Sequence, residues 1–165
     1  MSGLQLTSLE LVTHNEADVP FLSRLYASVR QAEFAAANWS ESQLNVFLSE
    51  QFNAQYRYYC QHYCTDSFNI IYYKNQAIGR LFVDYWLDER QDIRIVDISL
   101  LPEYRGLGVG THLFELLFQQ AISLGVTISI HVERNNPAIV LYERLGFSLK
   151  TETDEVYLLM VWRHQ

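Results

Sequence analysis

The chain has 165 residues, carries a formal net charge of −7 at pH 7 and is 49% hydrophobic. A chain of this length and composition can build one core, so we expect a single domain over residues 1–165. Its acidic balance argues against nucleic acid as a partner, because phosphate backbones bind basic surfaces. No stretch approaches the roughly 18–20 apolar residues of a membrane span, and residues 1–20 lack the basic and apolar regions of a secretory signal. We therefore expect a cytoplasmic protein without a membrane partner.

The first part of the chain predicts one strand and two helices. The strand is expected at Leu9–Thr13. In residues 16–30, apolar side chains recur at the helical spacing i, i+3, i+4 and i+7, namely at Leu22, Leu25, Tyr26 and Val29. Ser40 and Gln43 then form an S-x-x-Q capping box, which predicts the start of a second helix that reaches Tyr59 or beyond.

The rest of the chain predicts short strands with two further helices among them. A turn signal at residues 74–76 joins two β-rich runs into a hairpin. The expected strands are residues 68–73, 77–86, 92–101, 126–132, 147–153 and 156–162, the last two forming a second hairpin. The expected helices are residues 111–125, ended by Gly125, and residues 136–146, with Pro137 in the first turn. The element order β-α-α-β-β-β-α-β-α-β-β predicts a mixed sheet covered by helices.

The two cysteines, Cys60 and Cys64, flank His62 and at first suggest a metal site. In the expected helix the two thiols share a face, while His62 points to nearly the opposite side. These three side chains cannot bind one ion, and a closed zinc site needs four ligands. We therefore expect no metal, and we interpret both cysteines as buried structural thiols.

A glycine-rich turn is the most informative local feature. Residues 101–121 read LPEYRGLGVGTHLFELLFQQA, so that Gly106, Gly108 and Gly110 directly precede an apolar helical pattern. Such a turn is typical of a phosphate site, because the free N–H groups and the dipole of the first helical turn attract an anion, and glycine lets it approach.

Three nucleotide-site templates do not fit this turn. A P-loop needs Lys and then Ser or Thr after its last glycine, but Thr111 and His112 follow Gly110. The dinucleotide fingerprint G-x-G-x-x-G differs in spacing, because the three glycines here are two residues apart throughout. A protein-kinase glycine loop would need the rest of a kinase, which 165 residues cannot hold.

The segment Arg105-x-x-Gly108-x-Gly110 resembles the R/Q-x-x-G-x-G/A motif of the GCN5-related N-acetyltransferases (GNAT). Residues 131–147, HVERNNPAIVLYERLGF, are similar to the other signature of that family, in which an Asn four residues after a strand Val precedes an A-x-x-L-Y-x-x-x-G-F run. The resemblance runs from about residue 7 to the end of the chain, is densest over residues 92–147 and is weak over residues 30–66. It implies an α+β (α/β-like) GNAT fold: a central mixed, mostly antiparallel sheet of about six or seven strands with about four helices, splayed at the strands that flank the CoA-binding helix.

The resemblance also implies acetyl-CoA as the acetyl donor. Main-chain N–H groups of the glycine turn would bind the CoA pyrophosphate, and the strand before the turn would pair with the pantetheine arm. Asn136, four residues after Val132, takes the position of the family's Asn, with Asn135 as the alternative; either residue can instead cap the following helix. The implied cofactor-binding residues are Ile98, Ser99, Leu100, Arg105, Gly106, Leu107, Gly108, Val109, Gly110, Thr111, Asn136 and Tyr142.

For catalysis, the resemblance places Tyr142 where a phenol protonates the departing thiolate. The general base stays open. His131 corresponds to a strand position that carries a Glu base in the ribosomal-protein alanine acetyltransferases, and imidazole titrates near neutral pH. Asp97 and Glu133 are alternatives, and some members of the family have no single essential base.

The acceptor is expected to be a primary amine of a small molecule or a peptide, bound between the early helices and the sheet. Glu33 and Asp84 are candidates to attract its ammonium group. Aromatic residues of the second helix are candidates to line the acceptor site: Tyr56, Tyr58, Tyr59 and Tyr63. The leading hypothesis is an N-acetyltransferase that works by direct attack of the amine on the thioester. The alternative is an acyl-CoA-binding sensor or interaction module without turnover, and dimers are common in the family.

Overall fold

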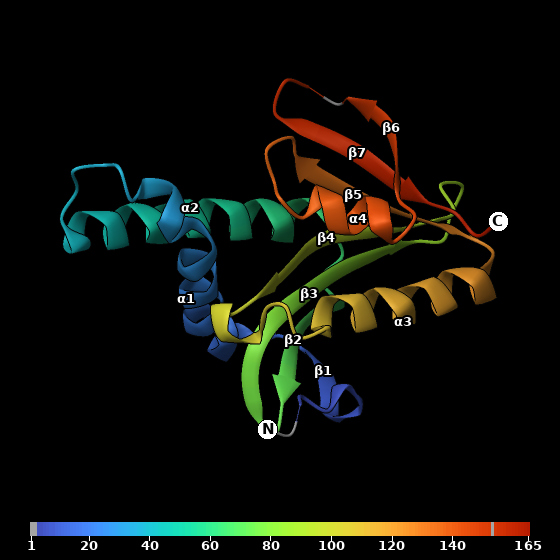
Figure 1. Cartoon of the computed structure of the whole chain (residues 1–165), viewed down its shortest axis with the longest axis horizontal. Coiled ribbons are helices and arrows are strands. Elements are labelled where there is room, and N and C mark those ends of the chain that lie inside the picture. The colour runs from blue at the N-terminus through green and yellow to red at the C-terminus, as the bar shows by residue number, and fades with distance from the viewer. Residues whose placement is uncertain (1–2, 153) are drawn as a thin grey trace. The chain divides into compact units, whose positions relative to one another are not determined.

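A computed structural model describes residues 3–152 and 154–165 of the chain and confirms the predicted element order. The strands are β1 (Leu9–Thr13), β2 (Ser67–Tyr73), β3 (Gln76–Trp86), β4 (Asp92–Leu100), β5 (Thr127–Glu133), β6 (Ser148–Glu152) and β7 (Tyr157–Trp162) (Figure 1). The α-helices are α1 (Val19–Arg30), α2 (Glu41–His62), α3 (Val109–Leu124) and α4 (Ile139–Arg144). Short 3-10 turns lie at η1 (Leu6–Ser8), η2 (Glu16–Asp18), η3 (Gln31–Phe34) and η4 (Pro102–Tyr104). Residue 153, the last residue of the strand expected over 147–153, lies outside the described residues.

The strands of the described residues form one seven-stranded sheet in the order β1-β2-β3-β4-β5-β7-β6. Pairs β1–β2, β5–β7 and β6–β7 are antiparallel, whereas β4 and β5 are parallel. The chain therefore has the predicted fold class, a mixed and mostly antiparallel open sheet with helices.

The parallel pairing of β4 with β5 is short. It runs from Asp92 opposite Thr127 to Ile95 opposite Ile130. Strand β4 continues to Leu100 and strand β5 to Glu133, but the ladder between them ends earlier. The pairing between the two strands that flank α3 therefore ends before either strand does.

The chain forms two compact units, each with apolar residues at its centre. The first unit is Met1–Phe82 with Asp97–Val109, and the second is Val83–Val96 with Gly110–Gln165. In the first unit α1 packs against α2, and the core includes Leu22, Leu25, Leu48, Phe52, Phe68, Ile70 and Ile78. In the second unit the core includes Ile93, Ile95, Leu113, Phe114, Leu117, Ile128 and Ile130. Strands β3 and β4 each contribute residues to both units.

Local signals account for most element boundaries. Ser40 Oγ accepts a hydrogen bond from Gln43 N at 3.2 Å, and Gln43 Oε1 accepts one from Ser40 N at 2.9 Å, so the predicted capping box opens α2. Lys74 and Asn75 adopt φ of 48° and 64°, the left-handed backbone of a tight hairpin turn between β2 and β3. Gly125 follows α3 with φ of +68°, which confirms it as the residue that ends the helix.

Two local predictions were wrong. Helix α4 begins at Ile139, so Pro137 lies in the turn before the helix rather than in its first turn. Helix α2 ends at His62, so Cys64 lies beyond it, and both Cys60 and Cys64 are exposed rather than buried. The thiols are exposed because the last turns of α2 present few buried positions; the buried residues of this helix are Leu48 and Phe52.

No helix within residues 3–152 and 154–165 is long and apolar enough to cross a membrane.

Candidate functional site

The glycine turn joins the end of β4 to the start of α3. Gly106 and Gly108 have φ of +70° and +85°, a backbone region that residues with a Cβ rarely adopt. A Cβ built at Gly106 or Gly110 would have no neighbour within 4 Å, and one at Gly108 would meet only Leu6 Cδ1 at 3.8 Å. The glycines are therefore not demanded by packing within the protein, and their faces are open to a ligand.

The first turn of α3 supplies the donors expected of such a site. The first four N–H groups of any α-helix lack partners within the helix, and α3 begins at Val109. Val109 itself is 1% exposed and anchors the helix start in the core, whereas Leu107 in the turn is 49% exposed. The turn thus combines an anchored helix with an open face toward which main-chain N–H groups can point.

The strand end before the turn is held at several points. Arg105 Nε donates a hydrogen bond to the Leu100 carbonyl at 2.9 Å, and Leu101 N donates one to the Ile78 carbonyl at 2.8 Å. On β3, Gly79 lies so close to β4 that a Cβ there would overlap the Ser99 carbonyl oxygen and lie 2.8 Å from Leu100 Cδ2. The half-buried residues Ile98–Leu100 of β4 therefore pack against β3 in a closely constrained position.

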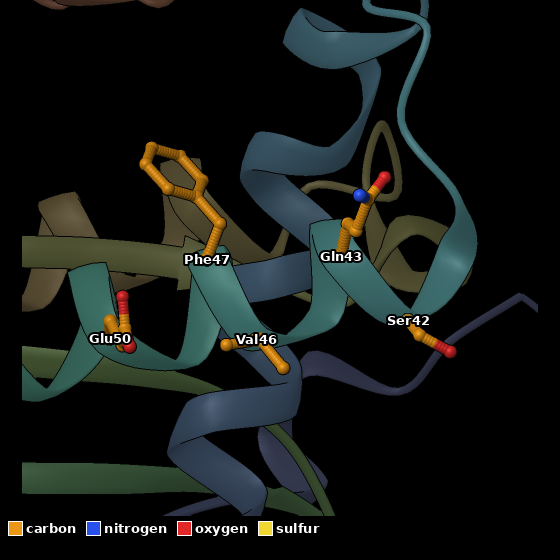
Figure 2. Close-up of a pocket in the computed structure, with 5 residues that line it drawn as sticks. All are labelled: Ser42, Gln43, Val46, Phe47 and Glu50. Carbon is orange, nitrogen blue, oxygen red and sulfur yellow. The ribbon is translucent and has the colours of Figure 1, made fainter.

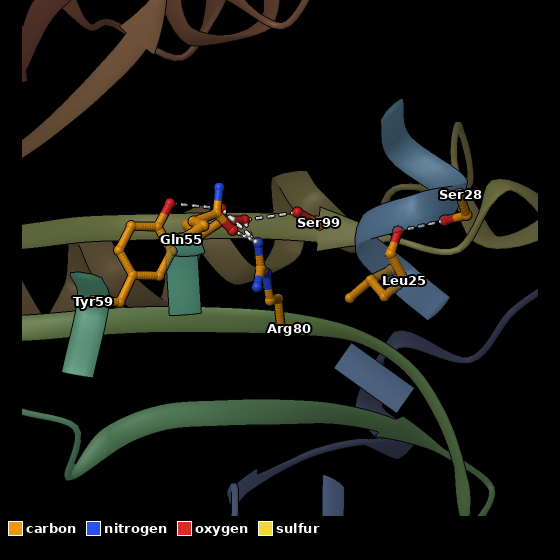
Figure 3. A network of polar contacts seen from close by, with 7 residues as sticks. Leu25, Ser28, Gln55, Tyr59, Arg80 and Ser99 are labelled. Atoms are coloured by element: carbon orange, nitrogen blue, oxygen red, sulfur yellow. Dashed lines mark hydrogen bonds and ion pairs between the residues drawn. The ribbon is translucent and has the colours of Figure 1, made fainter. Parts of the chain in front are cut away.

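Asp97 accepts hydrogen bonds from Arg80, Tyr59 and Ser99 in the first unit. Figure 3 shows these three side chains pointing toward one another. Asp97 Oδ1 accepts hydrogen bonds from Arg80 Nε at 3.2 Å and from Ser99 Oγ at 2.7 Å. Its Oδ2 accepts hydrogen bonds from Arg80 Nη2 at 2.9 Å and from Tyr59 Oη at 3.1 Å. Four donors on two oxygens fill the accepting capacity of this carboxylate.

Arg80 organises this network from a buried position. It is 2% exposed, and its Nη2 also donates to Gln55 Oε1 at 2.9 Å. Its guanidinium lies 5.1 Å from the centre of the Phe82 ring, while Nη1 is a buried nitrogen without a hydrogen-bond partner in the described part of the chain. Burial, and next the charge of Asp97, raise the pKa of the Tyr59 phenol well above its usual value, so Tyr59 is a hydrogen-bond donor at neutral pH.

His131 belongs to a second network, in the second unit. Arg94 Nη1 lies 2.9 Å from His131 Nδ1, and Arg94 Nε donates to Ser129 Oγ at 2.8 Å. Ser129 Oγ in turn donates to Asp92, whose other oxygen accepts from Thr127 Oγ1 at 2.6 Å. Because Asp92 pairs with Thr127 and Arg94 with Ser129 across β4 and β5, these side chains share one face of the sheet.

Charge and burial act together on His131. Burial lowers the pKa of the imidazole, the nearby Arg94 lowers it further, and Asp154 opposes part of this change. Arg94 is 8% exposed, and its guanidinium lies 4.6 Å from the centre of the Trp86 ring. His131 is therefore an exposed side chain whose Nδ1 contacts the buried guanidinium of Arg94.

Tyr142 and Asn136 lie on and just before α4, also in the second unit. Tyr142 is 5% exposed, with its ring centre 5.6 Å from that of Phe114 and 5.9 Å from that of Phe147. Asn136 Oδ1 accepts a hydrogen bond from Ala138 N at 2.9 Å, so this side chain holds the turn that leads into α4. Asn135, the alternative, is an exposed residue of the same connection.

The expected site residues thus group by unit. Asp97, Ile98–Leu100 and Arg105–Val109 belong to the first unit, and Gly110, Thr111, His131, Asn136 and Tyr142 belong to the second. Sequence reasoning missed Arg80 and Arg94, the partners of Asp97 and His131. Both are charged residues within otherwise apolar strand runs, AIGRLFV and DIRIV, and that placement was an available signal of a buried polar contact.

The side chains proposed for the acceptor have other partners. Glu33 forms an ion pair with Arg30 at 3.1 Å, and Asp84 is 6% exposed and accepts a hydrogen bond from Trp86 Nε1 at 2.8 Å. Tyr58 is 52% exposed and stacks on His62 with ring centres 4.0 Å apart. Tyr59, one of the four aromatic residues proposed to line the acceptor site, donates a hydrogen bond to Asp97.

A surface hollow of about 360 Å³ lies along α2 (Figure 2). It is lined by Ser42, Gln43, Val46, Phe47 and Glu50, all from successive turns of one helix. It includes none of the residues predicted for the donor or for catalysis. Within residues 3–152 and 154–165, no cluster of three or more His, Cys, Asp or Glu side chains is arranged to hold a metal ion.

The open mixed sheet with its helices, and the glycine turn that leads into α3, define an α+β protein. The model of the Acetyltransferase (GNAT) family matches residues 27–147, well over half of the chain. The chain therefore belongs to the Acetyltransferase (GNAT) family.

Solved structures share this fold. One is the PaiA N-acetyltransferase of Thermoplasma acidophilum in complex with coenzyme A, at a TM-score of 0.66 and 16% identity over 95% of this chain and 99% of that chain. Another is Arabidopsis thaliana Naa50 in complex with the bisubstrate analogue CoA-Ac-MVNAL, at a TM-score of 0.60 and 16% identity over 95% of this chain and 99% of that chain. At such low identities the likeness concerns the fold.

A curated relative is similar in sequence over part of its length. It is the ribosomal protein bS18-alanine N-acetyltransferase of Haemophilus influenzae, 37% identical over 75 residues. The match covers 45% of this chain and 49% of that protein, so it spans about half the length of the relative.

Proposed function

We propose that this protein is an N-acetyltransferase that transfers the acetyl group of acetyl-CoA to a primary amine, with residues 1–165 acting as one domain. The observation that carries the proposal is the glycine turn at the start of α3, with Gly106 and Gly108 at positive φ and their faces open. Membership of an acetyltransferase family and the coenzyme A bound to a protein of the same fold support the choice of donor.

The residues of the turn fit the donor. We assign the CoA pyrophosphate to the main-chain N–H groups from Gly106 to Thr111, where the α3 dipole favours an anion. The pantetheine arm is assigned to main-chain groups of Ile98–Leu100, beside which the pairing with β5 has already ended. Asn136 is assigned a contact with that arm in addition to its turn, because its amide N–H groups remain donors while Oδ1 holds Ala138 N.

Acetyl-CoA supplies a thioester that an amine attacks directly. We assign Tyr142 as the donor of a proton to the departing thiolate. The amine must be neutral to attack, and the assignment of His131 or Asp97 as its proton acceptor stays a prediction. Both groups contact a buried guanidinium, Arg94 and Arg80 respectively, and Asp97 accepts four hydrogen bonds. Main-chain N–H groups at the end of β4 are assigned to the oxyanion.

The acceptor is proposed to be a peptide or small-molecule amine. The curated relative, which matches this chain over about half of the relative's length, is an N-acetyltransferase for an alanine of a ribosomal protein. A protein of the same fold was solved with a peptide-bearing bisubstrate analogue. The expected cytoplasmic location and a homodimer are further predictions.

The first test is thermal stability with and without acetyl-CoA. Ligand at 100 times its Kd stabilises the folded state by about 2.7 kcal/mol, which raises Tm by roughly 5–10 °C for a chain of this size. Gly108→Ala is expected to abolish the shift, because its Cβ would occupy the space assigned to the pyrophosphate beside the N–H groups of Gly106–Thr111. Gly125→Ala is the matched control: it places a Cβ at the positive φ of +68° at the other end of the same helix and is expected to keep the shift.

An unchanged Tm at millimolar acetyl-CoA would overturn the proposed donor. The alternative function, an acyl-CoA sensor without turnover, is separated by Tyr142→Phe. If the protein is an enzyme, this variant loses acetylation rate and keeps its affinity for acetyl-CoA. If it is a sensor, even the unaltered protein acetylates no amine in a screen of amino acids, polyamines, amino sugars and peptides.

A further inference from the structure

The contact between Arg94 and His131 fixes which imidazole nitrogen carries the proton. A guanidinium is a donor only, so the 2.9 Å contact requires His131 Nδ1 to accept a hydrogen bond from Arg94 Nη1. An Nδ1 that accepts is unprotonated, and the neutral ring then carries its hydrogen on Nε2.

Arg94 cannot easily release this nitrogen. It is 8% exposed, its Nε donates to Ser129 Oγ at 2.8 Å, and its guanidinium carbon lies 4.6 Å from the centre of the Trp86 ring. Ser129 is itself 3% exposed and donates to Asp92, which Thr127 also contacts. The chain of contacts from Asp92 through Ser129 to Arg94 therefore presents a fixed N–H to His131.

Protonation of Nδ1 would break the bond to Arg94 and place a second cation beside a buried guanidinium. Around the imidazole, Arg94 faces it from β4 and Asp154 from the segment between β6 and β7, and Glu133 lies two residues along the same face of β5. The cross-strand neighbour on β7 is the apolar Leu159. Asp154 is exposed and turned toward the backbone, since its Oδ1 accepts from Val156 N and Tyr157 N, each at 2.7 Å. The close, buried charge is that of Arg94.

We propose that Arg94 is a positioning residue that holds His131 as a neutral imidazole with its hydrogen on Nε2, so that His131 offers a hydrogen-bond donor rather than a base. The partner of this exposed N–H is an oxygen, the carbonyl or carboxylate oxygen of a bound acetyl acceptor. This second part rests on the proposed function, whereas the tautomer does not. Deprotonation of the amine then does not pass through His131, which removes this residue from the two candidates for the proton acceptor named above.

Nitrogen NMR of the imidazoles tests the tautomer without any substrate. In protein labelled with ¹⁵N at histidine, His131→Gln assigns the His131 signals among the five histidines. We expect an unprotonated Nδ1 and a protonated Nε2 throughout pH 6–8. Arg94→Met is expected to raise the midpoint of the His131 titration and to populate both tautomers, while the signals of His112 on α3 stay in place.

A hydrogen on Nδ1 in the unaltered protein, or a charged imidazole at pH 7, would overturn the proposal. So would an Arg94→Met variant that folds and leaves the His131 signals unchanged. If Arg94→Met does not fold, Ser129→Ala is the second variant, because it frees Arg94 Nε and is expected to shift the same signals in the same direction.

Kinetics with an acceptor found in the amine screen test the donor role. Gln keeps an N–H at a similar reach but cannot accept a proton at neutral pH, so His131→Gln is expected to lower kcat/KM by no more than about threefold, and His131→Ala by about ten-fold or more, the cost of one lost hydrogen bond. If His131→Gln loses as much rate as His131→Ala, and the acid limb of the pH profile disappears with it, His131 is the base. If no amine is acetylated, the proposed function fails, while the NMR result still decides the tautomer.

Discussion

At the residue scale, each of the two candidates for the general base contacts a buried arginine. The Asp97 carboxylate contacts Arg80, and the His131 imidazole contacts Arg94. Arg80 and Asp97 form an ion pair at 2.9 Å, with side-chain exposures of 2% and 17%. A half-buried carboxylate that accepts four hydrogen bonds is well suited to hold β4 in place. Removing one member of a buried pair is costly, because the other charge stays buried without compensation.

We therefore predict that Arg80→Met lowers the free energy of unfolding by about 3 kcal/mol. The loss is expected although Met fills much of the same volume, because Asp97 keeps only Tyr59 and Ser99 as partners. Urea unfolding at pH 7, followed by circular dichroism, measures the change.

Arg134→Met is the control for this substitution. Arg134 pairs with Glu152 at 3.2 Å, and the two side chains are 41% and 61% exposed, so water already screens their interaction. An Arg80→Met protein as stable as Arg134→Met would show that the Asp97 network contributes nothing to stability.

The lowered pKa of His131 predicts a pH dependence of stability. In the unfolded chain the imidazole takes up a proton near pH 6.5, whereas in the folded chain burial and Arg94 delay this uptake to lower pH. Below about pH 6.5 the unfolded state therefore binds more protons, so stability falls as the pH falls toward the folded pKa. We predict that Tm drops less between pH 7 and pH 5 in His131→Gln than in the unaltered protein. Equal drops in calorimetric scans would contradict the lowered pKa.

At the element scale, the end of β4 depends on a glycine in its neighbour β3. Gly79 is buried, and an added Cβ would overlap the Ser99 carbonyl oxygen. Backbone atoms cannot give way as the end of a flexible side chain can, so β4 would have to move away from β3. The residues affected are Ser99 and Leu100, which are assigned to the pantetheine arm.

We predict that Gly79→Ala destabilises the protein by about 2 kcal/mol and also weakens acetyl-CoA binding. Thermal melts with and without acetyl-CoA measure both effects. Gly110→Ala is the stability control, because a Cβ there meets no atom within 4 Å and its φ is not positive. If Gly79→Ala keeps the full acetyl-CoA shift, the shape of β4 at Ser99 does not matter for the donor.

The elements themselves could be predicted because their signals are local. The Ser40–Gln43 capping box, the turn at Lys74–Asn75 and Gly125 each act within a few residues, and each is found where it was predicted. The start of α4 was misplaced because Asn136 holds a separate turn before it. Cys60 and Cys64 were wrongly predicted to be buried, because that prediction used the usual burial of cysteine as a residue type and did not ask which face of the helix lies against the core.

The candidate site could be predicted only in part. The glycine turn and the Tyr142 segment are contiguous motifs and can be read directly from the sequence. The pairs Arg80–Asp97 and Arg94–His131 join residues 17 and 37 positions apart. Such pairs depend on strand order and register, including the insertion of β7 between β5 and β6, and no local pattern encodes these.

At the scale of the whole molecule, the two units share strands. Strand β3 passes from the first unit to the second between Phe82 and Val83, and β4 passes back between Val96 and Asp97. When such a strand loses its backbone hydrogen bonds in one unit, we expect the same strand to lose its hydrogen bonds in the other unit as well. Independent domains are instead joined by exposed linkers that few contacts cross.

This continuity predicts that the chain unfolds in one cooperative transition, as a single domain does. Trp39 lies in the first unit, whereas Trp86 and Trp162 lie in the second, so tryptophan fluorescence can report on each unit separately. In Trp39→Phe the fluorescence follows the second unit, and in the double variant Trp86→Phe with Trp162→Phe it follows the first. Within each variant, we expect the urea midpoint by fluorescence to equal the midpoint by circular dichroism. Midpoints that separate within one variant would mean that the units unfold independently, and the chain would then be two domains joined by two strands.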